Sequence, residues 1–256
     1  MRTITLLTDF GLKDPYVGIM KGVILSINPD VMIVDITHEV EPQDIREGAF
    51  LLKEYCSFFQ SETIHVAIVD PTVGSPRRPV IVSKDGQFFV GPDNGIFSLL
   101  TGSNADVYAV ENRDFMLKNV SPTFHGRDIF APVAAYLSTG MQPSVFGNMI
   151  ANPVCLTDVF PDIVNDALLG EIIRFDRFGN AITNIDIEIF RDFTGGNPFR
   201  IVAAGLRFSS INRSYYEKDF TCVVGSSGYL EFGFYNGSFE AEKGVKKGDL
   251  VTVELL

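Results

Sequence analysis

An apolar, β-branched run at residues 66–69 ends in a carboxylate, Asp70, and a Pro/Gly turn then leads to two arginines, Arg77 and Arg78. In an open α/β sheet, ligands bind beyond the carboxyl ends of the strands. An aspartate at that edge, with an arginine returning across the turn, can hold a small polar reactant. The alternative is a surface ion pair that only closes the turn.

Two other loops in the first half of the chain carry residues of similar chemical character. Asp9 follows a strand-like run, where a carboxylate can accept both hydroxyls of a ribose or can cap a turn. His125 lies beside Gly126 ahead of a helical pattern. A ligand can approach a glycine backbone closely, and a helix N-terminus adds partial positive charge. A capping or buried histidine would fit the same pattern.

Two turns near the C-terminus are the remaining candidates. Residues 176–180 read Asp-Arg-Phe-Gly-Asn, and residues 225–229 read Gly-Ser-Ser-Gly-Tyr. The first can be a binding loop or a hairpin turn. In the second, backbone N–H groups and hydroxyls can hold a carboxylate, but the pattern taken alone favours an ordinary turn between strands.

Several familiar motifs are missing from the sequence. It contains no GxGxxG after a strand, no GxxxxGK[ST], no HExxH and no GxSxG. The cysteines Cys56, Cys155 and Cys222 form no CxxC pair, so they indicate neither a disulfide framework nor a zinc site. Cys56 falls at a helical spacing typical of a core residue.

The charge and hydropathy patterns restrict the partners. The formal net charge of −11 argues against a nucleic-acid partner and against an anionic membrane surface. The N-terminal apolar run is too short for a signal peptide, and no stretch has the length of a membrane span. We therefore expect a cytoplasmic protein that acts on a small molecule.

Strand-like and helix-like patterns alternate over residues 1–150, which predicts an α/β domain with a mostly parallel sheet and right-handed crossovers. A short helix is also expected after the turn at 91–95. The expected strands are 3–8, 31–36, 64–69, 80–82, 88–90 and 106–110. The expected helices are 16–27, 45–56 and one from about 126 to 137.

The pattern changes after residue 150. Residues 151–168 resemble a connector, and 169–256 predict a C-terminal β-barrel domain without a long helix. The expected strands there are 171–175, 182–187, 200–204, 221–224, 229–234 and 250–255. The predicted fold class is thus α/β, with an N-terminal α/β sandwich and a C-terminal β-barrel.

Taken together, these loops resemble the S-adenosylmethionine (SAM) hydrolases, also called SAM hydroxide adenosyltransferases, which are related to the fluorinating and chlorinating enzymes. The resemblance covers nearly the whole chain. It rests on Thr8-Asp9-Phe10-Gly11, Asp14-Pro15-Tyr16-Val17-Gly18, Val69-Asp70-Pro71, Pro92-Asp93-Asn94-Gly95, Phe124-His125-Gly126-Arg127-Asp128, Phe178-Gly179-Asn180 and Ser227-Gly228-Tyr229-Leu230-Glu231.

The resemblance implies that SAM and water give adenosine and L-methionine, with SAM as substrate and with no cofactor or metal. It implies a homotrimer whose sites lie between one subunit's N-terminal domain and its neighbour's C-terminal domain. It places the water-handling groups on Asp70, Arg77 and His125, and leaves open whether Asp70 or His125 takes the proton. The implied substrate-binding residues are Asp9, Phe124, Gly126, Asp176, Phe178, Asn180, Ser226, Tyr229 and Asn236.

Two positions depart from the family pattern. Thr72 stands where the family usually has glycine, and Tyr235 stands where asparagine is common near the adenine. The resemblance also favours Arg77 over Arg78 as the site arginine. Spacing alone does not separate these two neighbours.

Three other functions compete with SAM hydrolysis. A halide-dependent adenosyltransferase would lack the Asp, Arg and His set. A non-catalytic SAM- or adenosine-binding protein would leave SAM unchanged. A metal-dependent phosphoesterase would need several carboxylates around one ion, drawn from Asp9, Asp14, Asp70, Asp93 and Asp128.

Overall fold

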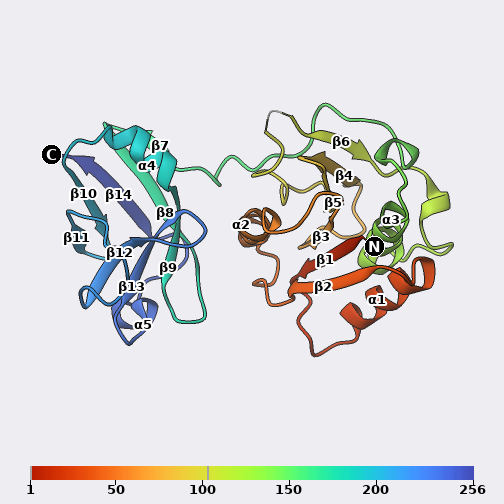
Figure 1. Cartoon of the computed structure of the whole chain (residues 1–256), viewed down its shortest axis with the longest axis horizontal. Coiled ribbons are helices and arrows are strands. Elements are labelled where there is room, and N and C mark those ends of the chain that lie inside the picture. The colour runs from red at the N-terminus through yellow and green to blue at the C-terminus, as the bar shows by residue number, and fades with distance from the viewer. Residues whose placement is uncertain (1, 103) are drawn as a thin grey trace. The chain divides into compact units, whose positions relative to one another are not determined.

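Apolar β-branched runs form the central sheet of the N-terminal part of the chain (Figure 1). The computed structural model describes residues 2–102 and 104–256. The chain divides into two compact units, one ending at Leu156 and the other beginning at Thr157. The strands of the first unit are β1 (Thr3–Thr8), β2 (Met32–Thr37), β3 (Ile64–Ile68), β4 (Pro79–Lys84), β5 (Gln87–Pro92) and β6 (Asp106–Ala109).

The order of this sheet is β2-β1-β3-β5-β4-β6. The β2-β1, β1-β3 and β3-β5 pairs are parallel, whereas β4 runs antiparallel to both β5 and β6. The mostly parallel sheet is therefore confirmed, and β4 and β5 form a hairpin around Asp85-Gly86.

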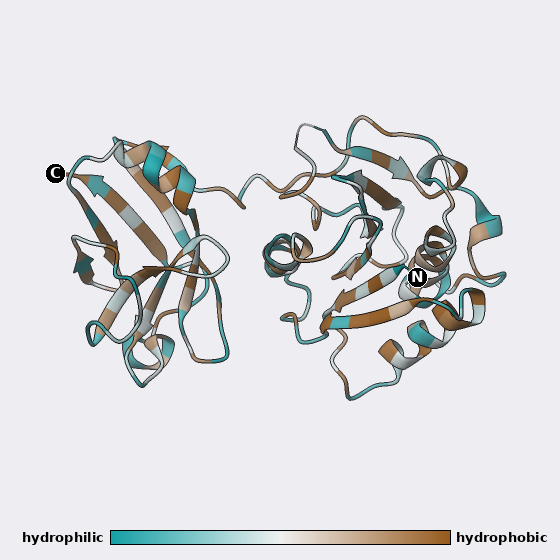
Figure 2. Cartoon of the chain, viewed as in Figure 1, coloured by the Kyte–Doolittle hydropathy of each residue, from teal (hydrophilic) through white to brown (hydrophobic). Residues whose placement is uncertain are grey.

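Helices cover both faces of the sheet, as an α/β sandwich requires. Apolar side chains of α1 (Tyr16–Ile27) and α3 (Ala131–Ser138) pack with alternate residues of β1 and β3 on one face. Leu52 and Cys56 of α2 (Ile45–Cys56) pack on the other face. Figure 2 shows the apolar strands between these helices. The buried position of Cys56 is confirmed.

One expected helix is absent. The segment after Gly95 forms successive hydrogen-bonded turns, in which Ser98 N–H donates to the Gly95 carbonyl and Leu100 N–H to that of Phe97. The expected short helix is therefore wrong. Few residues separate the tight turn from Thr101, so a helix has little length in which to propagate.

Antiparallel strands of the second unit curl into a nearly closed barrel with the order β11-β10-β14-β8-β9-β13-β12, which confirms the predicted C-terminal architecture. β7 (Asp162–Val164) pairs with β8, so strands already occur within the segment predicted as a connector. The other strands are β8 (Ala167–Phe175), β9 (Ala181–Asp186), β10 (Phe199–Ala203), β11 (Leu206–Phe208), β12 (Phe220–Val224), β13 (Tyr229–Phe234) and β14 (Leu250–Leu255).

Two short helices interrupt the barrel strands: α4 (Ile187–Thr194) and α5 (Phe239–Lys243). The predicted strand at 182–187 ends one residue early, because Asp186 caps α4 by accepting from Glu188 N–H at 2.7 Å. Gly195 ends α4 at φ 56°. In the part of the chain that the structure describes, no helix has the length and apolar character needed to cross a bilayer.

His65 is a buried titratable group of β3 on the face of the sheet that α2 covers. Its Nδ1 lies 2.8 Å from Thr5 Oγ1, and its ring stacks on Phe89. Burial lowers the pKa of His65 to about 4, because the imidazolium would lose its hydration. The folded protein therefore holds this ring neutral at pH values where the unfolded chain protonates it.

We predict that His65 makes the N-terminal unit acid-sensitive. As pH falls from the unfolded value of about 6.5 towards 4, only the unfolded chain binds the proton, so stability falls by up to about 3 kcal/mol. His65→Asn should lower stability at pH 7.5 but flatten this dependence. Urea unfolding at several pH values measures how steeply the free energy of unfolding changes with pH in each protein. An equal pH dependence in the variant and in the unaltered protein would contradict the prediction.

Candidate active site

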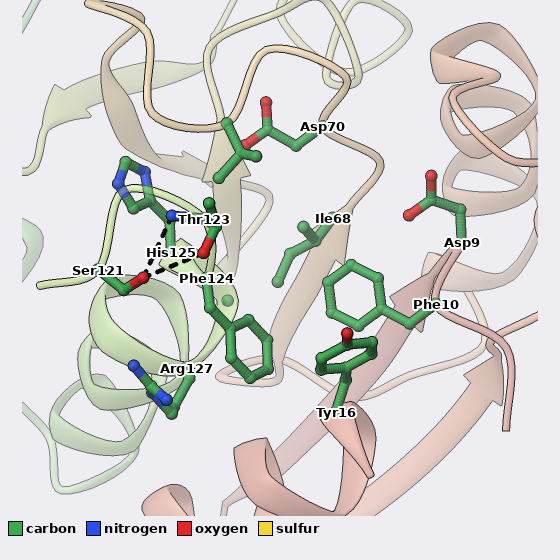
Figure 3. A pocket seen from close by; sticks show the side chains of 12 residues that line it. Asp9, Phe10, Tyr16, Ile68, Asp70, Ser121, Thr123, Phe124, His125 and Arg127 are labelled. Atoms are coloured by element: carbon green, nitrogen blue, oxygen red, sulfur yellow. Dashed lines mark hydrogen bonds between the residues drawn. The ribbon is translucent and has the colours of Figure 1, made fainter. Parts of the chain in front are cut away.

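A cleft of about 420 Å³ lies at the carboxyl ends of β1 and β3 (Figure 3). Parallel strands place their following loops at the same sheet edge, which is why residues distant in sequence meet there. The cleft is lined by Asp9, Phe10, Tyr16, Ile68, Asp70, Val73, Ser121, Thr123, Phe124, His125, Gly126 and Arg127. Five of the sequence-predicted residues thus lie around one cleft: Asp9, Asp70, Phe124, His125 and Gly126.

Arg77 joins Asp70 to His125. Its Nε–H lies 3.0 Å and 2.9 Å from the two Asp70 carboxylate oxygens, and its Nη2 donates to Asp70 Oδ2. The same Nη2 lies 2.9 Å from His125 Nδ1. The Arg77 and Asp70 side chains are only 7% and 5% exposed, so solvent screens this pair weakly. The three residues predicted as the water-handling set therefore form one hydrogen-bonded unit.

This contact fixes the protonation form of His125. An arginine guanidinium can only donate, so Nδ1 must be an unprotonated acceptor. Desolvation and the charge of Arg77 lower the pKa of His125, whereas Asp70 and Asp128 act in the opposite direction. Neutral His125 then carries its proton on Nε2, and this N–H is the ring group left for a molecule in the cleft.

The reversed direction of β4 explains how Arg77 returns to Asp70. β3 ends at the cleft edge, and β4 begins at that edge because it runs antiparallel to β5. The connection from β3 to β4 therefore stays at this edge of the sheet and does not cross to the opposite edge. Arg77 itself does not line the cleft. Its Cζ lies 5.4 Å from the centroid of the Phe130 ring, so the guanidinium acts from behind Asp70 and His125.

Asp9 lies across the cleft from His125 (Figure 3). Its Oδ2 accepts from the backbone N–H of Gln43 at 2.9 Å. Phe10, Tyr16 and Phe124 form an apolar wall, with centroid distances of 5.2 Å for Tyr16–Phe124 and 6.1 Å for the other two pairs. The cleft therefore combines a carboxylate suited to hydroxyl groups with a surface suited to a flat or aliphatic group.

A π-helical turn at Gly126–Phe130 leads into α3 and follows His125 directly. Such turns are frequent at functional sites. The loop before this π-helical turn packs against the Asp70 loop. The contact is so close at Gly74, whose φ is +82°, that an added Cβ would lie 2.3 Å from the Pro122 carbonyl oxygen. The two loops that supply Asp70 and His125 thus approach each other backbone to backbone.

Arg78 has a structural role. Its Nε lies 2.8 Å from Asp93 Oδ2, and its Nη1 and Nη2 donate to Asn152. It therefore ties the Asp70 loop to two other segments. Thr72 Oγ1 lies 3.3 Å from Asp70 Oδ1, so the residue that departs from the family pattern contacts the site carboxylate.

The predicted residues of the C-terminal unit are only partly brought together. Phe178, Asn180 and Asn236 line a second cleft of about 670 Å³. Asp176 closes the 176–180 turn by accepting from Asn180 Nδ2 at 2.8 Å, and it does not line this cleft. Other lining residues, which sequence reasoning missed, are Ser214, Tyr215, Tyr216, Phe234 and Gly237.

Ser226 is exposed on the turn before β13, and Tyr229 is buried in β13. Neither lines the second cleft. In the N-terminal unit, Phe10, Tyr16 and Arg127 line the first cleft and lie within the motifs that carried the family resemblance. Ser121 and Thr123 gave no such signal.

Three of the five carboxylates named for a metal-dependent phosphoesterase form ion pairs with arginines. Asp70 pairs with Arg77, Asp93 with Arg78, and Asp128 with Arg127. Among residues 2–102 and 104–256, no group of three or more His, Cys, Asp or Glu side chains is arranged to hold a metal ion.

The fold and the site define a two-part protein: an α/β unit with a carboxylate–arginine–histidine cleft, followed by a β-barrel. Residues 4–147 match the SAM hydroxide adenosyltransferase N-terminal domain, and residues 170–252 match the C-terminal domain of the same family. The chain belongs to the SAM hydroxide adenosyltransferase family.

Individual relatives agree with this membership. A Thermus thermophilus protein named (R)-S-adenosyl-L-methionine hydrolase is 36% identical, over 97% of this chain and 98% of its own length. A Methanocaldococcus jannaschii protein of the same name is 34% identical, over 89% and 86%. The crystal structure of an uncharacterized conserved protein from Thermotoga maritima superposes with a TM-score of 0.89 at 34% identity, covering 98% of this chain and 99% of that one.

We predict that Arg77→Met raises the pKa of His125. The change removes the positive charge and the donor that favour the neutral ring, while the negative charge of Asp70 remains. In the unaltered protein, ¹⁵N NMR of the imidazole should show the Nε2–H form. A pH titration of the His125 ring measures the shift.

Arg78→Met is the matched control, because it removes a neighbouring arginine that pairs with Asp93 and not with His125. Its His125 titration should stay at the value of the unaltered protein. An unchanged His125 titration in Arg77→Met would contradict the hydrogen-bonded unit described above.

Proposed function

We propose that this protein hydrolyses SAM to adenosine and L-methionine. The observation that carries the proposal is the bridge from Arg77 to Asp70 and His125 at a cleft that also holds Asp9. The names of the Thermus thermophilus and Methanocaldococcus jannaschii relatives support it.

In the proposed reaction, the oxygen of a bound water attacks C5′ of the ribose as the C5′–S bond breaks. The electron pair of that bond stays on sulfur, so the sulfonium becomes the neutral thioether of methionine. The leaving group therefore needs no proton. The demanding part is the nucleophile, because bulk water has a pKa of about 15.7.

Asp70 and His125 provide complementary groups for that water. Its oxygen accepts from His125 Nε2–H, one of its protons is donated to Asp70, and a lone pair remains for C5′. After attack, the proton passes to Asp70 and then to solvent. This assigns proton acceptance to Asp70 and orientation to His125, with Arg77 holding both in place.

Substrate binding follows the chemistry of the lining residues. Asp9 accepts the two ribose hydroxyls, and the wall that includes Phe124 packs on the apolar parts of the substrate beside Gly126. For the methionine and adenine ends we propose residues 176–180 and 226–236 of a neighbouring subunit. These include Asp176, Phe178, Asn180, Ser226, Tyr229 and Asn236.

The proposal includes a homotrimer in the cytoplasm, whose reaction needs neither a metal nor a cofactor. Residues 1–150 and 169–256 would be its two functional domains, joined by 151–168. These statements rest on the family resemblance and on the sequence.

Incubation of the purified protein with SAM should release equal amounts of adenosine and methionine, measured by liquid chromatography. Asp70→Ala and His125→Ala should each lower kcat by about 100-fold or more, because each removes a group that positions or deprotonates the water. Asp106→Asn, on the far strand β6, should keep full activity. Release of no adenosine by the unaltered protein would end the proposal.

The same assay separates the competing functions. Formation of a halogenated nucleoside in chloride or fluoride would favour a halide-dependent adenosyltransferase, and SAM that stays bound and intact would favour a binding protein. Activity that a chelator abolishes and a divalent ion restores would contradict metal independence.

Mixing two inactive variants tests the shared site. If His125 and Asn180 of one site come from different chains, then His125→Ala and Asn180→Ala, dissociated together and reassociated, should recover about a quarter of the activity. Each variant treated alone should stay inactive. Sedimentation should show a trimer, and absence of recovery in a re-formed trimer would contradict the shared site.

A further inference from the structure

Asp128 is a buried carboxylate that the proposed reaction does not use. It has 0% exposure and does not line the cleft. It lies in the π-helical turn Gly126–Phe130, three residues after His125. A buried charge is costly unless it is paired and hydrogen-bonded, so its partners indicate what it does.

The partners of Asp128 hold the loop that precedes His125. Its Oδ2 accepts from the backbone N–H of Ser121 at 2.7 Å. Its own backbone N–H donates to the Phe124 carbonyl at 3.2 Å, and its carbonyl accepts from Leu117 N–H at 2.9 Å. The 117–124 segment is thus tied to Asp128 at its beginning, middle and end.

The carboxylate also holds Arg127. Arg127 Nε lies 2.6 Å from Oδ1 and Nη2 lies 3.0 Å from Oδ2. The guanidinium lies over the ring of Phe124, 5.2 Å from its centroid. Asp128 therefore also holds Arg127 against Phe124, one ring of the apolar wall in the cleft. Figure 3 shows Arg127 and Phe124 in the cleft.

Charged groups reach His125 from two directions. Arg77 and Asp70 face it from the loop after β3, and Asp128 acts on it from its own π-helical turn. Arg127 and Asp9 line the same cleft. The charge of Asp128 therefore offsets part of the effect of Arg77 on the pKa of His125.

We propose that Asp128 is a positioning residue for His125. Its carboxylate fixes the 121–125 loop by the Ser121 bond and neutralises Arg127, and it acts on the water through His125 without touching the substrate. This inference rests on the proposed SAM hydrolysis for its kinetic part, while its structural part concerns the His125 ring alone.

The test compares Asp128→Asn with the unaltered protein by two measurements, the pKa of His125 and kcat as a function of pH. An asparagine keeps an acceptor for Ser121 but loses the charge, so the pKa of His125 should fall further below its ordinary value. The low-pH limb of kcat should move to lower pH in parallel. With an uncharged acceptor for Ser121 and no charge to hold Arg127, the loop should position His125 less well, and kcat should fall about 10-fold or more with a smaller change in KM.

Arg127→Met should shift the pKa of His125 in the opposite direction. It leaves the negative charge of Asp128 without its partner, so the pKa of His125 should rise. Asp93→Asn is the matched control, because Asp93 is also buried, also pairs with an arginine and also accepts from a backbone N–H, that of Val154 at 2.8 Å. It should lower stability without moving the His125 titration.

NMR titration of His125 needs no turnover, so it separates this inference from the proposed function. If the unaltered protein releases no adenosine, SAM hydrolysis fails and the titration still decides the role of Asp128. A His125 pKa and a kcat in Asp128→Asn that match those of Asp93→Asn would overturn the proposal. Should Asp128→Asn not fold, absence of an upward shift in Arg127→Met would overturn it equally.

Discussion

The site depends on one property of arginine: its guanidinium donates hydrogen bonds in fixed directions and never accepts one. Placed between a carboxylate and an imidazole, it donates a hydrogen bond to each of them. Asp70 is held by Nε and Nη2 together, and His125 is left with an acceptor at Nδ1. The chemical difference between the two groups facing the cleft, one acceptor and one donor, follows from this contact.

The sheet topology makes the contact possible. Three parallel pairings collect the ends of β1 and β3 at one edge, where Asp9 and Asp70 lie. A uniformly parallel sheet would carry the chain after Asp70 to the opposite end before the next strand began. The antiparallel β4 keeps Arg77 at the cleft edge, and the π-helical turn after His125 completes the site from a third segment.

The sequence predicted the helices and strands with strong apolar periodicity. It did not predict the features whose conformation depends on a few local hydrogen bonds. The strands and helices of the first unit follow from apolar spacing. By contrast, α4 is only eight residues long and depends on the flanking caps Asp186 and Gly195. Adjacent Arg77 and Arg78 look equivalent in the sequence. They differ only because Asp70 faces one and Asp93 faces the other. Ser121 and Thr123 line the cleft because their loop packs against Gly74, a contact that no local pattern encodes.

The short connection between Asp70 and Arg77 also lowers the chain-entropy cost of forming the site. These residues are separated by 7 positions, and Arg77 and His125 by 48, so closing the second loop costs roughly 2 kcal/mol more chain entropy. The first contact is local in the chain, while the second requires α3 to be docked on the sheet. Asp70 and Arg77 therefore form the local half of the site, and His125 adds a long-range contact whose chain-entropy cost the rest of the fold must offset.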